Sequence, residues 1–122
     1  MEDLPPRSEC KNFSVIKPHR RLKNVPPAVN KSYRKIPYIS VHEFVNLLEE
    51  VKILLPKITT PILIMHGTED HTVNIESANF IYEKINSTFK EKIFVSNCGH
   101  LLPLTETRDF VFAEVLKFLV KN

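Results

Sequence analysis

The stretch P-I-L-I-M-H-G-T-E-D, residues 61–70, decides the fold of this chain together with N-C-G-H at residues 97–100. The first stretch is an apolar run that ends at Gly67 and presents the carboxylate of Asp70. A second run, residues 92–95, precedes the imidazole of His100, and the chain between the runs has helical periodicity. Apolar runs joined by a helix predict parallel strands, whose carboxyl ends share one edge of the sheet. The sequence therefore predicts an α/β fold that brings Asp70 and His100 to that edge.

Helical spacing of apolar side chains predicts three helices around these strands. The first spans residues 40–55, where S-V-H-E matches a capping box with Ser40 as N-cap and Glu43 reaching back to it. Pro56 ends this helix. The second is predicted at residues 76–85 and the third at residues 107–120. Four side chains of the third helix are expected to face inward: Val111, Val115, Phe118 and Leu119.

Length and composition bound the class of protein. The chain has 122 residues, of which 43% are apolar, and this suits a single globular domain. No apolar run approaches the length of a membrane span. The first residues, M-E-D-L-P-P-R, lack the basic-then-apolar pattern of a signal peptide, so a cytoplasmic location is expected. The two cysteines, Cys10 and Cys98, form neither a disulfide framework nor a zinc-site spacing.

Positive charge is concentrated in the first third of the chain. Residues 1–35 hold nine Lys or Arg against three acidic residues, a net charge of +6, whereas the rest of the chain carries −3. Five prolines lie in the same part, so residues 1–39 are predicted to be a basic, partly irregular segment ahead of a domain at residues 40–122. The cluster of Arg20, Arg21 and Lys23 raises the hypothesis of a nucleic-acid arm. No nucleic-acid-binding motif accompanies it, and no nucleic-acid partner is expected.

Three motifs resemble one known family. P-I-L-I-M-H-G-T-E-D-H-T-V is similar to the penultimate strand and acid loop of the carboxylesterase and monoacylglycerol-lipase branch of the α/β-hydrolases. S-A-N-F-I-Y-E-K-I resembles the helix that follows there, and C-G-H-L-L-P-L-T-E-T-R-D resembles the loop of the catalytic histidine. The resemblance covers residues 37–122, and residues 1–55 loosely resemble the tail of that family's helical cap. It implies the C-terminal βαβα portion of an α/β-hydrolase fold, with strands near 62–65 and 92–95, after a cap-like helical segment.

The resemblance also implies roles for two residues. Asp70 would be the orienting acid and His100 the general base of a Ser-His-Asp triad, in the chain order of α/β-hydrolases. An imidazole suits the role because it exchanges a proton near neutral pH, and a buried carboxylate holds it in one tautomer. The G-x-S-x-G elbow of the nucleophile does not occur, since the only glycines are Gly67 and Gly99. The nucleophile is therefore expected to lie outside this chain.

Other interpretations of these residues stay open. Asp70 alone is also typical of a turn that caps the following helix. His66, at the strand end, is expected to be packed and hydrogen-bonded. The set His66, Asp70 and His71 matches no zinc signature, so no metal site is expected. Cys98 lies too close in sequence to His100 to place its sulfur against the imidazole, and a structural thiol is expected.

These patterns predict part of a carboxylic ester hydrolase of the carboxylesterase or monoacylglycerol-lipase type, inactive alone and without a cofactor. A small ester would be its substrate once a nucleophile-bearing segment completes it, although thioesterases and peptidases use the same acid and base. A non-catalytic interaction module and a subunit of a split hydrolase are the alternatives. Because so narrow a sheet leaves apolar edges unpaired, self-association or binding of a complementary hydrolase fragment is expected.

Overall fold

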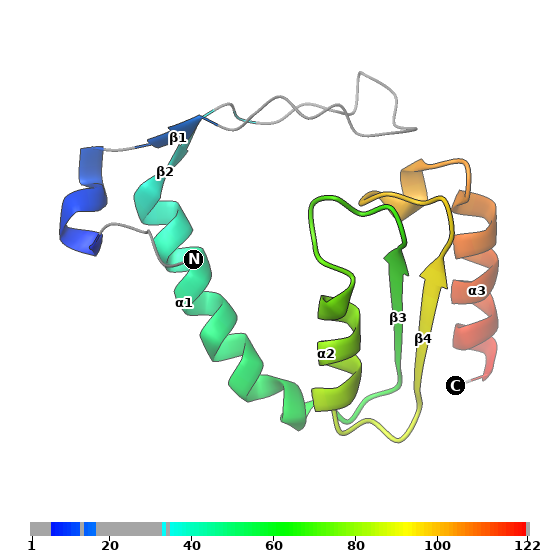
Figure 1. Cartoon of the computed structure of the whole chain (residues 1–122). Coiled ribbons are helices and arrows are strands. Elements are labelled where there is room, and N and C mark those ends of the chain that lie inside the picture. The colour runs from blue at the N-terminus through cyan, green and yellow to red at the C-terminus, as the bar shows by residue number, and fades with distance from the viewer. Residues whose placement is uncertain (1–5, 13, 17–32, 34, 122) are drawn as a thin grey trace. The chain divides into compact units, whose positions relative to one another are not determined.

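The computed structural model describes residues 6–12, 14–16, 33 and 35–121 (Figure 1). Its contacts divide the chain into two compact units, with a boundary after Leu54. The first unit contains a short 3-10 helix (Arg7–Asn12), β1 (Ser14–Ile16), β2 (Lys35–Pro37) and α1 (Tyr38–Leu54). The second contains β3 (Ile62–Gly67), α2 (Glu76–Lys84), β4 (Lys90–Val95) and α3 (Arg108–Lys121), with 3-10 turns at Leu55–Lys57 and Leu102–Leu104. The predicted division into residues 1–39 and 40–122 stays a prediction, since much of the first segment lies outside the described residues, as does the cluster of Arg20, Arg21 and Lys23.

The first unit begins earlier in the sequence than its periodicity indicates. β1 and β2 pair antiparallel within the segment predicted to be partly irregular, so regular structure starts ahead of the helix predicted at residues 40–55. α1 starts at Tyr38, which places Ser40 inside its first turn and excludes it as the N-cap. Glu43 makes an ion pair of 2.7 Å with Arg7 of the 3-10 helix, so a tertiary contact replaces the predicted capping box.

α1 has 17 residues and buries none of them. Its apolar side chains lie at helical spacing as predicted, yet Phe44 is 58% exposed and Leu47 53% exposed. The small β1–β2 sheet and the 3-10 helix therefore cover only part of the apolar face. No helix within the described ranges combines the length and the hydropathy needed to cross a membrane.

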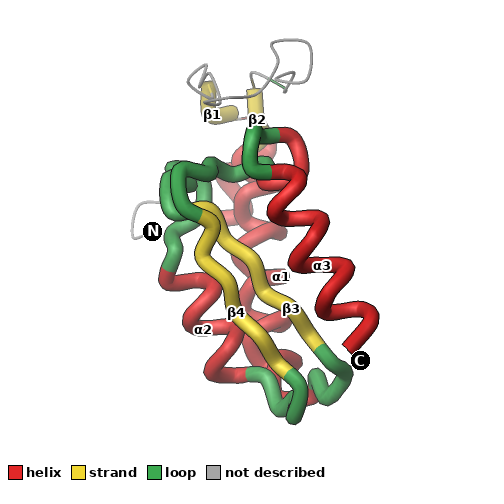
Figure 2. The backbone as a smooth tube through the Cα atoms, turned by 90° about the vertical axis from the view of Figure 1, so that its right-hand side faces the viewer, coloured by secondary structure: helices red, strands yellow, loops and turns green. Residues whose placement is uncertain are grey.

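The second unit is a βαβα arrangement, as predicted. β3 and β4 pair in parallel from Ile62 opposite Lys90 to Gly67 opposite Val95. Figures 1 and 2 show α2 and α3 on opposite sides of this two-stranded sheet, and both strands end at the same edge. Both strands are longer than predicted. β3 continues past residue 65 to Gly67, and β4 begins at Lys90 rather than at residue 92. The first four residues of β3 are all apolar, as is typical of a strand covered on both faces.

The core lies between the sheet and α3. Val95, Cys98 and Val111 are buried together, and Met65, Ile93 and Leu102 pack against them. Val111 and Phe118 face inward and are buried, as predicted. Val115 and Leu119 also lie on the side of α3 that faces β3, but they are 37% and 67% exposed, so this part of the inward face is not buried. Two strands are too narrow to cover the whole apolar stripe of α3, which explains the difference.

Candidate active site

The loops after β3 and β4 are joined by backbone hydrogen bonds at the carboxyl edge of the sheet. The amide of Thr68 donates to the carbonyl of Val95 at 3.0 Å, and the amide of Glu69 donates to the carbonyl of Cys98 at 2.9 Å. Gly67 permits this approach, because a Cβ at that position would lie 2.2 Å from the carbonyl oxygen of Cys98. The two loops therefore lie close together because residue 67 has no side chain.

Asp70 is fixed by its own loop. Its Oδ1 accepts hydrogen bonds from the amides of Thr72 at 2.7 Å and Val73 at 3.0 Å. This turn satisfies the interpretation of Asp70 as a loop aspartate, but α2 is capped by another residue, since Asn74 Oδ1 accepts from the amide of Glu76 at 3.0 Å. The turn leaves Oδ2 of Asp70 directed at other groups.

The His100 loop is held by small polar side chains. Asn97 takes a left-handed φ of 54° where the loop leaves β4. Cys98 is fully buried, and its Sγ lies 3.3 Å from Oγ1 of Thr105, which donates to the carbonyl of Leu102 at 2.9 Å. Cys98 is thus a structural thiol, as predicted, although sequence reasoning gave no signal for its partner Thr105.

Asp70 and His100 meet between the two loops. Nδ1 of His100 lies 3.0 Å from Oδ2 of Asp70, which is a hydrogen bond. Because a carboxylate only accepts, Nδ1 carries the proton and donates it. The Asp70 side chain is 4% exposed and that of His100 38% exposed. The result is a buried carboxylate that orients an accessible imidazole.

The contacts of Asp70 also set its charge. Burial of this carboxyl raises its pKa. The hydrogen bonds from His100, Val73 and Thr72, together with the charge of His100, lower the pKa, and their combined effect is larger than that of burial. The pKa of Asp70 therefore lies below its ordinary value of 3.8. Asp70 is ionised at neutral pH and faces His100 as an anion.

His66 completes the polar cluster from the strand side. Its ring is buried, and Nδ1 lies 2.9 Å from the carbonyl oxygen of Gly67, so His66 is packed and hydrogen-bonded as predicted. Its Nε2 lies 3.6 Å from Oδ2 of Asp70. The sequence analysis considered His66 and Asp70 together only as part of a metal set, although their spacing of four residues across the strand end was a signal for a direct contact. Within the described ranges, no group of three or more His, Cys, Asp or Glu side chains could hold a metal ion.

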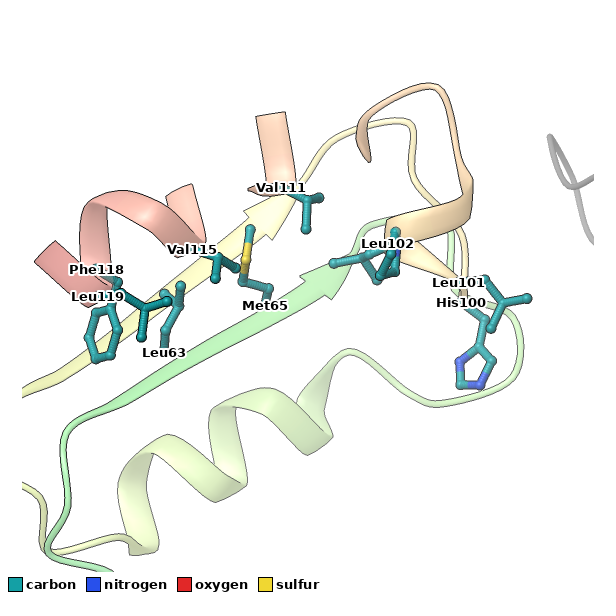
Figure 3. A pocket seen from close by; sticks show the side chains of 10 residues that line it. Leu63, Met65, His100, Leu101, Leu102, Val111, Val115, Phe118 and Leu119 are labelled. Atoms are coloured by element: carbon teal, nitrogen blue, oxygen red, sulfur yellow. The ribbon is translucent and has the colours of Figure 1, made fainter. Parts of the chain in front are cut away.

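An apolar groove of about 450 Å³ runs between β3 and α3 toward His100. Figure 3 shows Leu63 and Met65 of β3 opposite Val115 and Leu119 of α3, with His100 at one end of the labelled side chains. The groove contains few polar atoms besides those of His100. Part of the apolar surface of this unit is therefore uncovered beside the polar cluster.

Comparison with known families identifies the chain. The profile of the family described as serine aminopeptidase, S33 matches residues 19–108. This chain belongs to that family of α/β-hydrolases. A carboxylesterase of Bacillus subtilis (strain 168) is 30% identical over 91 residues, which are 75% of this chain and 37% of the relative. A thermostable monoacylglycerol lipase of Bacillus sp. (strain H-257) is 32% identical over 101 residues, 83% of this chain and 40% of the relative.

Solved structures agree with this placement. One of two metagenome-derived lipolytic enzymes superposes with a TM-score of 0.68 at 27% identity, covering 75% of this chain and 37% of that enzyme. A serine hydrolase involved in carbazole degradation superposes with a TM-score of 0.53 at 22% identity, covering 70% of this chain and 33% of the other, and shares the fold. The chain thus spans about two fifths or less of the length of these relatives, and its βαβα unit is part of an α/β-hydrolase fold.

Proposed function

We propose that this chain supplies the acid and the base of a carboxylic ester hydrolase, with Asp70 as the orienting acid and His100 as the general base. The observation that carries the proposal is the 3.0 Å hydrogen bond from Nδ1 of His100 to the buried Oδ2 of Asp70. Family membership and relatives named carboxylesterase and monoacylglycerol lipase support the ester as substrate. The serine nucleophile would come from residues outside this chain, which contains no G-x-S-x-G.

The geometry fits the chemistry of acyl transfer. Since Nδ1 of His100 donates to Asp70, Nε2 keeps its lone pair and can take the proton of a serine hydroxyl. The serine oxygen then bonds to the ester carbonyl carbon, and the same proton passes from Nε2 to the departing alcohol. Water hydrolyses the acyl-enzyme by the same route, again with His100 as the base. The anionic Asp70 stabilises the imidazolium that forms in each half-reaction.

A chimera tests this proposal. The chain would replace the matching part of the Bacillus subtilis carboxylesterase, which keeps its own remaining residues. We expect the chimera to hydrolyse p-nitrophenyl butyrate. Replacing either residue, Asp70→Ala or His100→Ala, should lower kcat by about 10³-fold or more, because triad members act as a unit.

The control for this experiment is His42→Ala, which removes a histidine from α1 and should leave kcat within about twofold. A folded chimera that hydrolyses no ester, or one whose activity survives His100→Ala, would contradict the proposed roles. A folded but inactive chimera would favour the alternative of a non-catalytic interaction module. The uncovered apolar groove beside β3 is the observation that supports that alternative.

A further inference from the structure

His66 contains a buried nitrogen that the proposed chemistry does not use. Its side chain is 11% exposed, and its Nδ1 faces the carbonyl oxygen of Gly67 at 2.9 Å. A carbonyl only accepts, so Nδ1 carries a proton. Among the described residues, no hydrogen-bond partner satisfies Nε2 of the same ring. Buried polar atoms without a partner are rare in folded proteins, so the direction in which this nitrogen points calls for an explanation.

Nε2 of His66 faces the carboxylate of Asp70. An ionised carboxylate can accept about four hydrogen bonds. Three contacts are present within the described part of the chain: Oδ1 accepts from the amides of Thr72 and Val73, and Oδ2 accepts from His100. The remaining capacity is on Oδ2, and Nε2 of His66 lies 3.6 Å from that atom. The two imidazoles thus approach the same oxygen of Asp70.

His66 lies on the face of β3 that packs against α2. Side chains alternate along β3, and Leu63 and Met65 face α3, so Ile64 and His66 face α2. The elements packed there carry these ionisable residues: Lys90, Glu91 and Lys92 of β4, Glu76, Tyr82, Glu83 and Lys84 of α2, and Glu69 and His71 of the adjoining loop. Among the described residues, the side chains of His66, at 3.6 Å, and His100, at 3.0 Å, are the ones that place a ring nitrogen against Oδ2 of Asp70.

We propose that His66 is a positioning residue for the acid–base pair. Its ring, anchored by the carbonyl of Gly67, closes the strand side of the Asp70 carboxylate, excludes water from Oδ2 and keeps that oxygen directed at His100. This inference rests on the proposed roles of Asp70 and His100, and it concerns the strength of their hydrogen bond.

The experiment measures that hydrogen bond in the full chain, without any hydrolysis. The Nδ1 proton of His100 would be observed by NMR and assigned by its loss in Asp70→Asn and His100→Gln. His66→Gln keeps an N–H donor for the carbonyl of Gly67, whereas His66→Met has similar length and no donor. We expect the proton to exchange with water about tenfold faster in His66→Met and within about threefold of the wild-type rate in His66→Gln.

Ile64→Ala is the matched control, because it removes volume from the same face of β3 without touching Asp70. It should lower thermal stability but leave the exchange rate of the His100 proton within about threefold. Equal rates in His66→Gln and His66→Met, or an effect of Ile64→Ala as large as that of His66→Met, would overturn the inference. In the esterase chimera, His66→Met should lower kcat with little change in KM.

The NMR measurement separates this inference from the proposed function. An inactive chimera together with the expected exchange rates would reject the esterase role and retain His66 as the residue that positions Asp70. An active chimera in which His66→Met changes neither the exchange rate nor kcat would retain the esterase role and reject His66 as the residue that positions Asp70.

Discussion

At the carboxyl edge of the β3–β4 sheet this chain satisfies the polar groups of the loops, whereas it leaves much of the apolar surface of α3 uncovered. At the edge, Asp70 accepts three hydrogen bonds from neighbouring groups, and the two loops are joined through their backbones. On α3, by contrast, Leu116 is 61% exposed, Leu119 67% and Val120 80%. The acid–base pair needs only two adjacent βα units, whereas the apolar covering of α3 needs more of a sheet than two strands. Residues of this chain are thus enough to form the Asp70–His100 pair, but they are not enough to cover the apolar surface of α3.

The largest effect on the edge is expected for Gly67→Ala. The added Cβ would lie 2.2 Å from the carbonyl oxygen of Cys98, so the two loops would have to separate. We expect the free energy of unfolding, measured with urea on dilute protein, to fall by about 3 kcal/mol. Gly99→Ala is the matched control, since its Cβ would meet its nearest neighbour, the carbonyl oxygen of Glu69, at 3.9 Å. A cost for Gly67→Ala no larger than that of Gly99→Ala would show that the loops do not need this close approach.

The exposed apolar surface of α3 is expected to drive association, and its effect should be smaller than that of Gly67→Ala. Leu119 lines the groove and is 67% exposed, so Leu119→Lys replaces apolar surface with a charge. The wild-type chain should self-associate in sedimentation experiments, and Leu119→Lys should weaken its association constant by about tenfold or more. Thr88→Lys adds the same charge at an exposed turn and should change the constant little. A wild-type chain that stays monomeric at high concentration would contradict this account of the α3 face.

The features that depend on local motifs could be predicted from the sequence, and the features that depend on distant residues could not. The βαβα order and the meeting of Asp70 with His100 are predictable because each depends on a short motif and on the rule that parallel strands end together. The start of α1 is not, because the Arg7–Glu43 ion pair joins residues far apart in the sequence. The exposure of Leu119 could not be predicted either. Helical periodicity indicates which side chains form an apolar face, but it contains no information on the width of the sheet opposite that face.

The smallest expected effect is the pH dependence of stability that comes from Asp70. Its pKa in the folded chain lies below the ordinary value of 3.8, so its ionised form stabilises the fold above that pH. This contribution should be lost as the pH falls from about 3.8 through the folded pKa. The difference in unfolding free energy between wild type and Asp70→Asn should therefore shrink as the pH falls below about 3.8. A difference that grows as the pH falls would contradict the hydrogen bonding assigned to this carboxylate.

Reaction with a fluorophosphonate, which phosphonylates activated serine hydroxyls, tests the central claim most directly. Chain and chimera would be treated side by side, and the labelled residue located by mass spectrometry. The account predicts no labelled serine in the chain alone and one labelled serine in the chimera, within the part that comes from the carboxylesterase. It also predicts that His100→Ala slows labelling of the chimera by about 10³-fold or more. Labelling of a serine in the chain alone that His100→Ala abolishes would contradict the claim that the nucleophile lies outside these residues.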